Sequence, residues 1–78
     1  MITIESKTGR ASVRPGEMGR VEVTAMFGEK AATFHVRAGD NVAECVAALK
    51  GWLHFSIVVE RKLITAIHAV RGDMGMGR

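Results

Sequence analysis

The sequence predicts a single α+β domain in which one helix packs on one face of an antiparallel sheet of four to five strands. Residues 40–54 carry apolar side chains at helical spacing, and residues 21–38 alternate apolar and polar side chains around a short link. Residues 56–70 are rich in β-branched side chains, which favour strands. The expected order is β-β-β-α-β-β over residues 1–71, with residues 72–78 as a flexible C-terminal tail.

Residues 40–54 are expected to form the helix against which the strands pack. Their apolar residues recur at steps of three and four and share one stripe: Val42, Cys45, Val46, Leu49 and Leu53. Asn41 followed by Glu44 has the spacing of a capping box, with Asp40 as a competing N-cap. Burial of the stripe would contribute on the order of 10 kcal/mol, so packing rather than propensity holds this helix. Gly51 either ends the helix or lies inside it.

Three strands are expected before the helix. Residues 2–5 alternate and suit a short edge strand. Residues 7–19, with three glycines and the only proline, are expected to form a long loop with a few extended residues near Ala11 to Arg14. Residues 21–27 and 32–38 form a predicted hairpin. Its apolar side is expected to face the core: Val21, Val23, Ala25, Phe27, Ala32, Phe34, Val36 and Ala38. Its polar side is expected to face solvent: Glu22, Thr24, Met26, Thr33, His35 and Arg37.

Residues 56–70 fit two structures. Their spacing is compatible with a helix, but β-branched residues are frequent. We therefore expect two strands, residues 56–60 and 63–70, with a turn at Arg61 and Lys62. That turn contains neither glycine nor asparagine, the residues that tight turns favour.

Composition limits the classes of function. An apolar content of 47% in 78 residues favours a folded chain over a disordered one. The single Cys45 excludes an internal disulfide, and its place on the helical stripe indicates a small buried side chain. No apolar stretch approaches the ~18 residues that span a bilayer, and residues 1–10 do not resemble a signal peptide. We expect a cytoplasmic protein without membrane association.

The basic residues are unevenly distributed. The net charge is +3, and residues 7–20 alone hold four basic residues and one acidic residue. This imbalance indicates an acidic partner, either nucleic-acid phosphate or an acidic protein surface. The alternative is a solvated loop whose charges only increase solubility.

No pattern of catalytic or metal-ligating residues is present. His35, Cys45, His54 and His68 are each at least nine residues apart, whereas zinc ligands occur in close pairs. The serines lack a nucleophile-elbow pattern, and neither a Walker loop nor a dinucleotide-binding glycine motif occurs. We therefore expect no metal, no cofactor and no enzymatic activity.

Binding to another macromolecule is the class of function that remains after these exclusions. Single-strand nucleic-acid binders expose aromatic side chains, but Phe27 and Phe34 are expected in the core, so we favour a protein partner. Five cations, expected on one side of the sheet, would supply the electrostatic contacts: Arg10, Arg14, Arg20, Lys30 and Arg37. Thr33 and His35 would add exposed sheet contacts. A small basic nucleic-acid-binding protein is the alternative, and the edge strand permits either a monomer or a homodimer.

Three segments together carry a resemblance to a known class of proteins. They are RVEVTAMFGEKAATFHVRAG, DNVAECVAALKGWLH and SIVVERKLITAIHAV. Their layout resembles the small phage-encoded anti-CRISPR proteins, several of which combine an antiparallel sheet with one helix. The resemblance implies a non-enzymatic inhibitor in the host cytoplasm that occludes a CRISPR effector complex, and it assigns no site residues. The basic balance departs from the acidic DNA mimics of that class, which implies that this chain would cover an acidic patch or wedge against a subunit.

Overall fold

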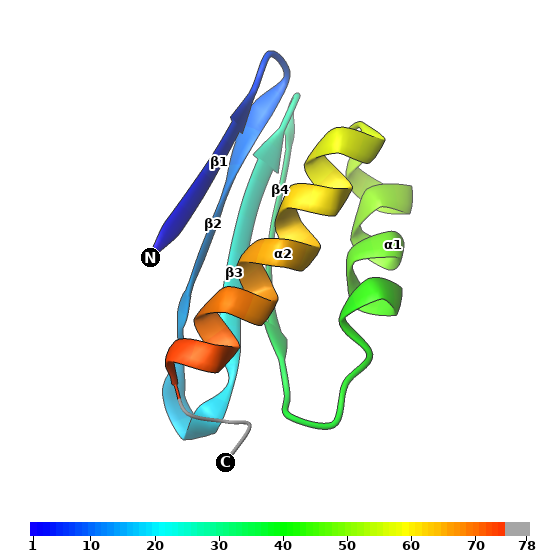
Figure 1. Cartoon of the computed structure of the whole chain (residues 1–78). Coiled ribbons are helices and arrows are strands. Elements are labelled where there is room, and N and C mark those ends of the chain that lie inside the picture. The colour runs from blue at the N-terminus through cyan, green and yellow to red at the C-terminus, as the bar shows by residue number, and fades with distance from the viewer. Residues whose placement is uncertain (75–78) are drawn as a thin grey trace.

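Two helices cover one face of a four-stranded antiparallel sheet in the computed structural model, which describes residues 1–74 (Figure 1). The strands follow one another in the sheet in chain order, so each pairs with its sequence neighbour. The elements are β1 Ile2–Ser6, β2 Gly9–Pro15, the 3₁₀ turn η1 Glu17–Gly19, β3 Val21–Phe27, β4 Lys30–Val36, α1 Val42–Leu53 and α2 Ile57–Asp73. The predicted α+β class and antiparallel sheet are confirmed. However, β4 is followed by two helices, whereas one helix and two strands were expected.

The predicted central hairpin is confirmed as β3 and β4. Gly28 and Glu29 form its two-residue turn, and Gly28 has φ +63°, a conformation that glycine adopts without strain. The apolar side faces the helices as expected: Val21, Val23, Ala25, Phe27 and Val36 are buried, and Ala32 and Phe34 are half-buried. The alternating pattern identifies both faces of this hairpin, except at Ala38, which was expected on the core face but is exposed because β4 ends at Val36.

The long loop predicted over residues 7–19 is wrong, because the extended residues expected near Ala11 to Arg14 belong to a full strand, β2. Lys7 and Thr8 form a two-residue turn, and β2 then pairs with β1 on one side and β3 on the other. Ala11 and Val13 are buried on the core face, whereas Arg10 and Arg14 point away from the core. Only Ala11 and Val13 alternate with polar residues in this segment. The alternation that predicts a strand is therefore too short to outweigh the glycines and the proline.

The predicted helix is confirmed as α1. The Asn41 side chain accepts a hydrogen bond from the Glu44 backbone N–H at 3.0 Å, as the capping pattern indicated. Gly51 lies inside the helix, which ends at Leu53 with His54 in the left-handed conformation. Four residues of the predicted stripe are buried: Val42, Val46, Leu49 and Leu53.

The two strands predicted over residues 56–70 are wrong, because this segment forms the single helix α2. Ser56 caps it by accepting a hydrogen bond from the Val59 backbone N–H at 3.3 Å. The buried residues recur at helical steps: Val59, Leu63, Ala66, Ile67 and Val70. Packing of this stripe on the sheet outweighs the strand preference of β-branched residues, a preference that depends on context. Gly72 and Asp73, predicted as tail, belong to the last turn, and residues 75–78 lie outside the described residues.

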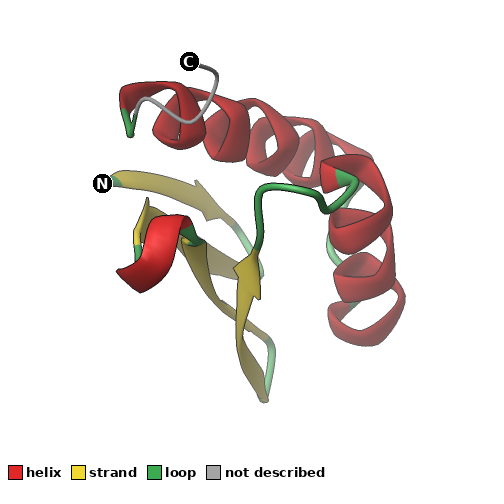
Figure 2. Ribbon diagram, turned by 90° about the horizontal axis from the view of Figure 1, so that it is seen from below, coloured by secondary structure: helices red, strands yellow, loops and turns green. Residues whose placement is uncertain are grey.

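Both helices lie on the same side of the sheet, and the other side is left uncovered by the described elements (Figure 2). α2 crosses β1, β2 and β3, while α1 packs beside α2 and β4. We call the uncovered side the open face. Its side chains are Thr3, Glu5, Arg10, Ser12, Arg14, Glu22, Thr24, Met26, Ala31, Thr33 and His35. Neither helix has the length and apolar character needed to traverse a bilayer.

Replacement of two glycines by alanine should change the stability of the fold in opposite directions. A Cβ atom on Gly9 would overlap the carbonyl oxygen of Met26 in the neighbouring strand, whereas a Cβ atom on Gly51 would meet nothing within 4 Å. We expect Gly9→Ala to lower the free energy of unfolding by ~2–3 kcal/mol, because β2 and β3 must move apart. Gly51→Ala should raise it by ~0.5–1 kcal/mol through helix propensity.

Urea unfolding followed by circular dichroism measures both changes. Gly51→Ala serves as the matched control, since it adds the same methyl group in open space. An unchanged unfolding midpoint for Gly9→Ala would contradict the close approach of β2 and β3 at this position.

Candidate functional site

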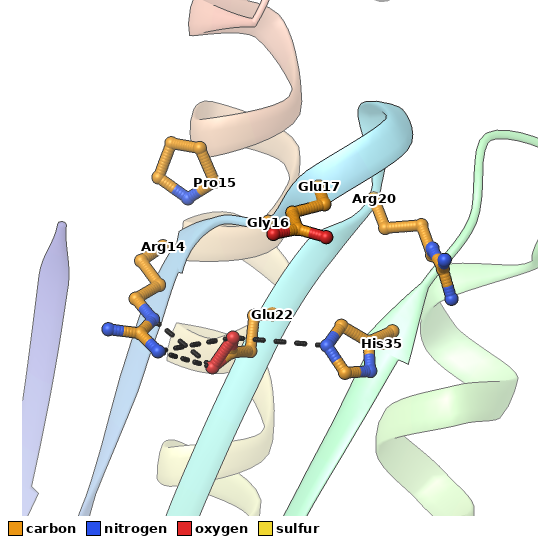
Figure 3. A pocket seen from close by; sticks show the side chains of 7 residues that line it. All are labelled: Arg14, Pro15, Gly16, Glu17, Arg20, Glu22 and His35. Atoms are coloured by element: carbon orange, nitrogen blue, oxygen red, sulfur yellow. Dashed lines mark hydrogen bonds and ion pairs between the residues drawn. The ribbon is translucent and has the colours of Figure 1, made fainter.

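Four of the seven predicted contact residues lie at one end of the sheet, where β2 turns into β3 and β4 leaves for α1. Arg14 ends β2, Arg20 precedes β3, His35 lies near the end of β4, and Arg37 follows it. A shallow pocket of about 580 Å³ opens here (Figure 3). We call it the arginine pocket, and it is lined by Arg14, Pro15, Gly16, Glu17, Arg20, Glu22 and His35.

Glu22 organises the arginine pocket. The Arg14 guanidinium donates to Glu22 Oε1 from Nη2 at 2.7 Å and from Nε at 3.1 Å, and His35 Nε2 lies 3.8 Å from Glu22 Oε2. These three residues lie opposite one another on adjacent strands, so the sheet register holds them together. The hydrogen bond from Arg14 lowers the pKa of the Glu22 carboxyl below its ordinary 4.5.

Arg20 differs from its neighbours because no carboxylate pairs with it within residues 1–74. Its Nη2 atom contacts the Met18 sulfur at 3.4 Å. Arg37, by contrast, lies 3.9 Å from Asp40 Oδ2, and the same oxygen accepts the Arg37 backbone N–H at 2.9 Å. Arg20 and Arg37 also line a second groove of about 380 Å³ at this end. Arg20 therefore offers a guanidinium for an anionic group of a partner.

The other three predicted residues are dispersed. Thr33 lies in the middle of the open face, where its hydroxyl is 3.4 Å from that of Thr24. Arg10 lies toward the opposite end, in register with Met26. The placement expected for Lys30 is wrong: its Nζ donates to the Trp52 carbonyl at 3.0 Å and lies 5.6 Å from the centre of the Trp52 ring. Because Lys30 is an even number of residues from Phe34 and Val36 in β4, its side chain lies on the same side of the sheet, which is the helix side.

Some open-face residues were not predicted as contacts. A row of hydroxyl side chains crosses all four strands at matching register positions, in which Thr3, Ser12 and Thr24 join the predicted contact Thr33. Met26 is 53% exposed, and Glu5 lies opposite Arg10. The polar alternation of each strand marks such positions, but only the register brings them into rows.

The histidine, cysteine and acidic side chains do not gather into a reactive cluster among the residues that the structure describes. No group of three His, Cys, Asp or Glu side chains is close enough to hold a metal ion in the described part of the chain. Cys45 is half-buried beside the core, and burial raises the pKa of its thiol, with the nearby Asp40 and Glu44 carboxylates adding to the effect. A thiol with a raised pKa is protonated at neutral pH and is a poor nucleophile.

No family model, no curated protein and no solved structure matches this chain. The functional assignment therefore depends on the geometry and charge of the described residues, together with the architectural resemblance drawn from the sequence.

The link between Arg14 and Glu22 gives a testable pH dependence. Replacement of Arg14 by methionine should raise the pKa of Glu22 toward 4.5, because the hydrogen-bonded guanidinium is removed. Since the folded-state pKa lies below the unfolded value, the pair stabilises the fold above the unfolded pKa, and this stabilisation is lost as pH falls through the folded pKa. Stability curves of the two proteins should therefore converge in acid.

A carboxyl-carbon NMR titration of Glu22 measures the pKa shift directly. Arg10→Met removes a cation from the same face without touching Glu22, so it is the control and should leave the Glu22 titration unchanged. A Glu22 pKa that is identical in Arg14→Met and in the unmodified chain would contradict the pairing.

Proposed function

We propose that this chain is a non-enzymatic protein-binding module that docks through its open face and sterically blocks a larger nucleic-acid-handling complex. The observation that carries the proposal is the uncovered face itself, on which polar, charged and exposed methionine side chains lie in rows across the strands. In a small domain, such a face supplies contact area without a deep cavity. Of the three segments that carry the resemblance to anti-CRISPR inhibitors, the β3–β4 hairpin and α1 have the expected form, whereas the third is helix α2. The resemblance of the first two segments suggests a CRISPR effector complex as the target.

The side chains of the open face suit a protein partner. Methionine and arginine are enriched in protein interfaces, and the exposed Met26 lies in register beside Arg10. Threonine and serine hydroxyls in the middle rows can donate and accept hydrogen bonds. Carboxylates are interspersed with the cations, so the face has mixed charge.

Charge favours an acidic patch on the partner. Arg10 lies on the open face and Arg20 lies in the arginine pocket at the other end of the sheet, and neither is paired with a carboxylate among residues 1–74. Arg14 is already engaged by Glu22. The two unpaired guanidiniums would therefore steer the partner and set its orientation, as charges at interface rims do.

The size of the face bears on how the partner is held. Three spacings of ~4.8 Å and strands of seven residues at ~3.3 Å make the sheet about 14 Å by 23 Å. The product of these dimensions, on the order of 300 Å², is smaller than the ~800 Å² of surface that each partner buries in a standard interface. Adjoining turns and edges of the domain are therefore expected to take part.

A nucleic-acid-binding protein is the second candidate, and the unpaired Arg10 and Arg20 favour it. Two features weigh against it. Phe27 is buried on the core face with its ring 5.1 Å from that of Phe55, so it is not available for base stacking. Glu5 and Glu22 also interrupt the cations along the open face, where a phosphate backbone would have to run.

Charge reversal at Arg20 tests the protein-binding proposal. Purified CRISPR effector complexes from several types are immobilised, and binding of the chain and blockage of target-DNA binding are measured. We expect Arg20→Glu to weaken binding by about tenfold or more, equivalent to ~1.4 kcal/mol, because an unpaired guanidinium becomes a repelling carboxylate. The variant should fold normally, since no ion pair within residues 1–74 is lost.

The control is the exchange Lys50→Glu with Glu60→Lys, which reverses a cation of α1 on the helix side of the domain and keeps an ion pair between positions 50 and 60. It should bind the complex like the unmodified chain. Equal affinity of Arg20→Glu and the unmodified chain would remove the arginine pocket from the interface.

An electrophoretic shift assay separates the second candidate. A nucleic-acid-binding protein shifts free DNA or RNA, and its affinity falls steeply as salt rises from ~50 to ~200 mM. We expect no shift of free nucleic acid by this chain. A salt-dependent shift that Arg10→Glu and Arg20→Glu abolish would favour nucleic-acid binding instead.

A further inference from the structure

The two edges of the sheet differ in their surroundings. α1 packs beside β4, and the Lys30 side chain at the start of β4 is bonded to the end of that helix. Strand β1 forms the other edge, and no described element lies beyond it (Figure 1). The backbone of β1 is therefore a strand edge of the described chain that no other described element covers and that is open to an incoming strand.

The register identifies the backbone groups that point outward from β1. Lys7 and Thr8 form a two-residue turn, so Ser6 and Gly9 are a hydrogen-bonded pair, and pairing alternates from there along the antiparallel ladder. Thr3 and Glu5 are then non-hydrogen-bonded positions relative to β2. Their N–H and C=O groups face away from the sheet and can pair with another strand.

This edge lacks the features that usually protect edge strands. It contains no proline and no bulge, and its register with β2 is continuous over all five residues. Its first residues, Ile2, Thr3 and Ile4, are β-branched and favour strand pairing. Glu5 is the only charged side chain of β1, and it points to the open face.

A groove of about 430 Å³ runs beside the same edge, between β1 and α2. Its floor is mainly apolar, formed by Ile2, Ile4, Ala66 and Ala69 together with Thr3 and Thr65. Arg61 and Lys62 border it, both are exposed, and neither forms an ion pair within residues 1–74. No carboxylate lines the groove.

We propose that β1 accepts an extended acidic segment of a partner protein as an additional antiparallel or parallel strand. The backbone of the segment pairs with the outward groups of Thr3 and Glu5. Alternate side chains of the segment enter the groove, where apolar ones contact Ile2 and Ile4 and carboxylates pair with Arg61 and Lys62. This site lies on the edge and the helix side of the sheet and does not depend on the function proposed for the open face.

Charge argues against a second copy of the chain as the occupant. The side chains that a second β1 would direct into the groove are Ile2, Ile4 and Ser6, none of which is acidic. Pairing of two copies would also place two sets of Arg61 and Lys62 along one junction, and each copy carries a net charge of +3. An acidic partner segment satisfies these cations, whereas a second copy leaves them facing like charge.

Binding of defined peptides tests the proposal. The probe is a capped, fluorescent heptapeptide with threonine at every odd position and glutamate, valine and glutamate at the even positions. The comparison peptide has lysine in place of both glutamates. Fluorescence anisotropy with the full chain should show binding of the glutamate peptide below about 1 mM and at least about tenfold weaker binding of the lysine peptide.

Two variants separate backbone pairing from charge. Thr3→Pro removes an outward N–H that the β1–β2 ladder does not use, and proline is tolerated on the solvent side of an edge strand. It should weaken binding of the glutamate peptide by about tenfold or more, whereas Thr3→Val, which keeps the N–H, should stay within about twofold. Arg61→Glu combined with Lys62→Glu should make the chain bind the lysine peptide more tightly than the glutamate peptide. This double variant tests the proposal even if Thr3→Pro fails to fold.

The outcomes are distinct. Arg20→Glu, in the arginine pocket, should leave peptide affinity unchanged, so failure at one surface does not imply failure at the other. The proposal is overturned if neither peptide binds, if both bind equally, or if Thr3→Pro binds as well as Thr3→Val. It is also overturned if sedimentation shows a dimer of the unmodified chain that Thr3→Pro converts to a monomer, because a second copy would then occupy the edge.

Discussion

Burial of one helical stripe on a sheet of small and β-branched side chains determines most of this structure. Leu63 and Ile67 of α2 are fully buried against a sheet whose inner face includes Val13 and Val23, also fully buried. Each large side chain removed from water contributes ~1.5–3 kcal/mol, and a short chain has few other sources of stability. The sheet can leave its other face uncovered because α2 and α1 together satisfy the apolar side.

The elements that the sequence predicted correctly are those that carry their own local signals. The β3–β4 hairpin has a clean period of two around Gly28, and α1 has both an apolar stripe and an Asn41 cap. For α2 the local signals conflict, since β-branched residues occupy a segment with helical spacing. The conflict is resolved by the sheet on which α2 lies, and that surface is not visible from residues 56–70 alone.

The same distinction applies to the candidate site. Alternation within strands was sufficient to place Thr33 and His35 on the polar face. It could not show that Glu22 joins Arg14 to His35, because that contact depends on pairing with β2, a strand the sequence pattern did not identify. Lys30 is mispredicted for a related reason: the alternating pattern is recognisable only from Ala32 onward, whereas β4 begins at Lys30, so the pattern does not show that the Lys30 side chain lies on the helix side.

The chain order of the elements has a consequence for how the protein is made. All four strands precede both helices, and α2, which covers β1 and β2, is the last described element. Strands joined by short turns can pair early because their contacts are local in sequence. During synthesis the apolar side of the sheet is therefore unshielded until α2 has emerged, so the nascent chain is prone to aggregation in the interval before α2 has been translated.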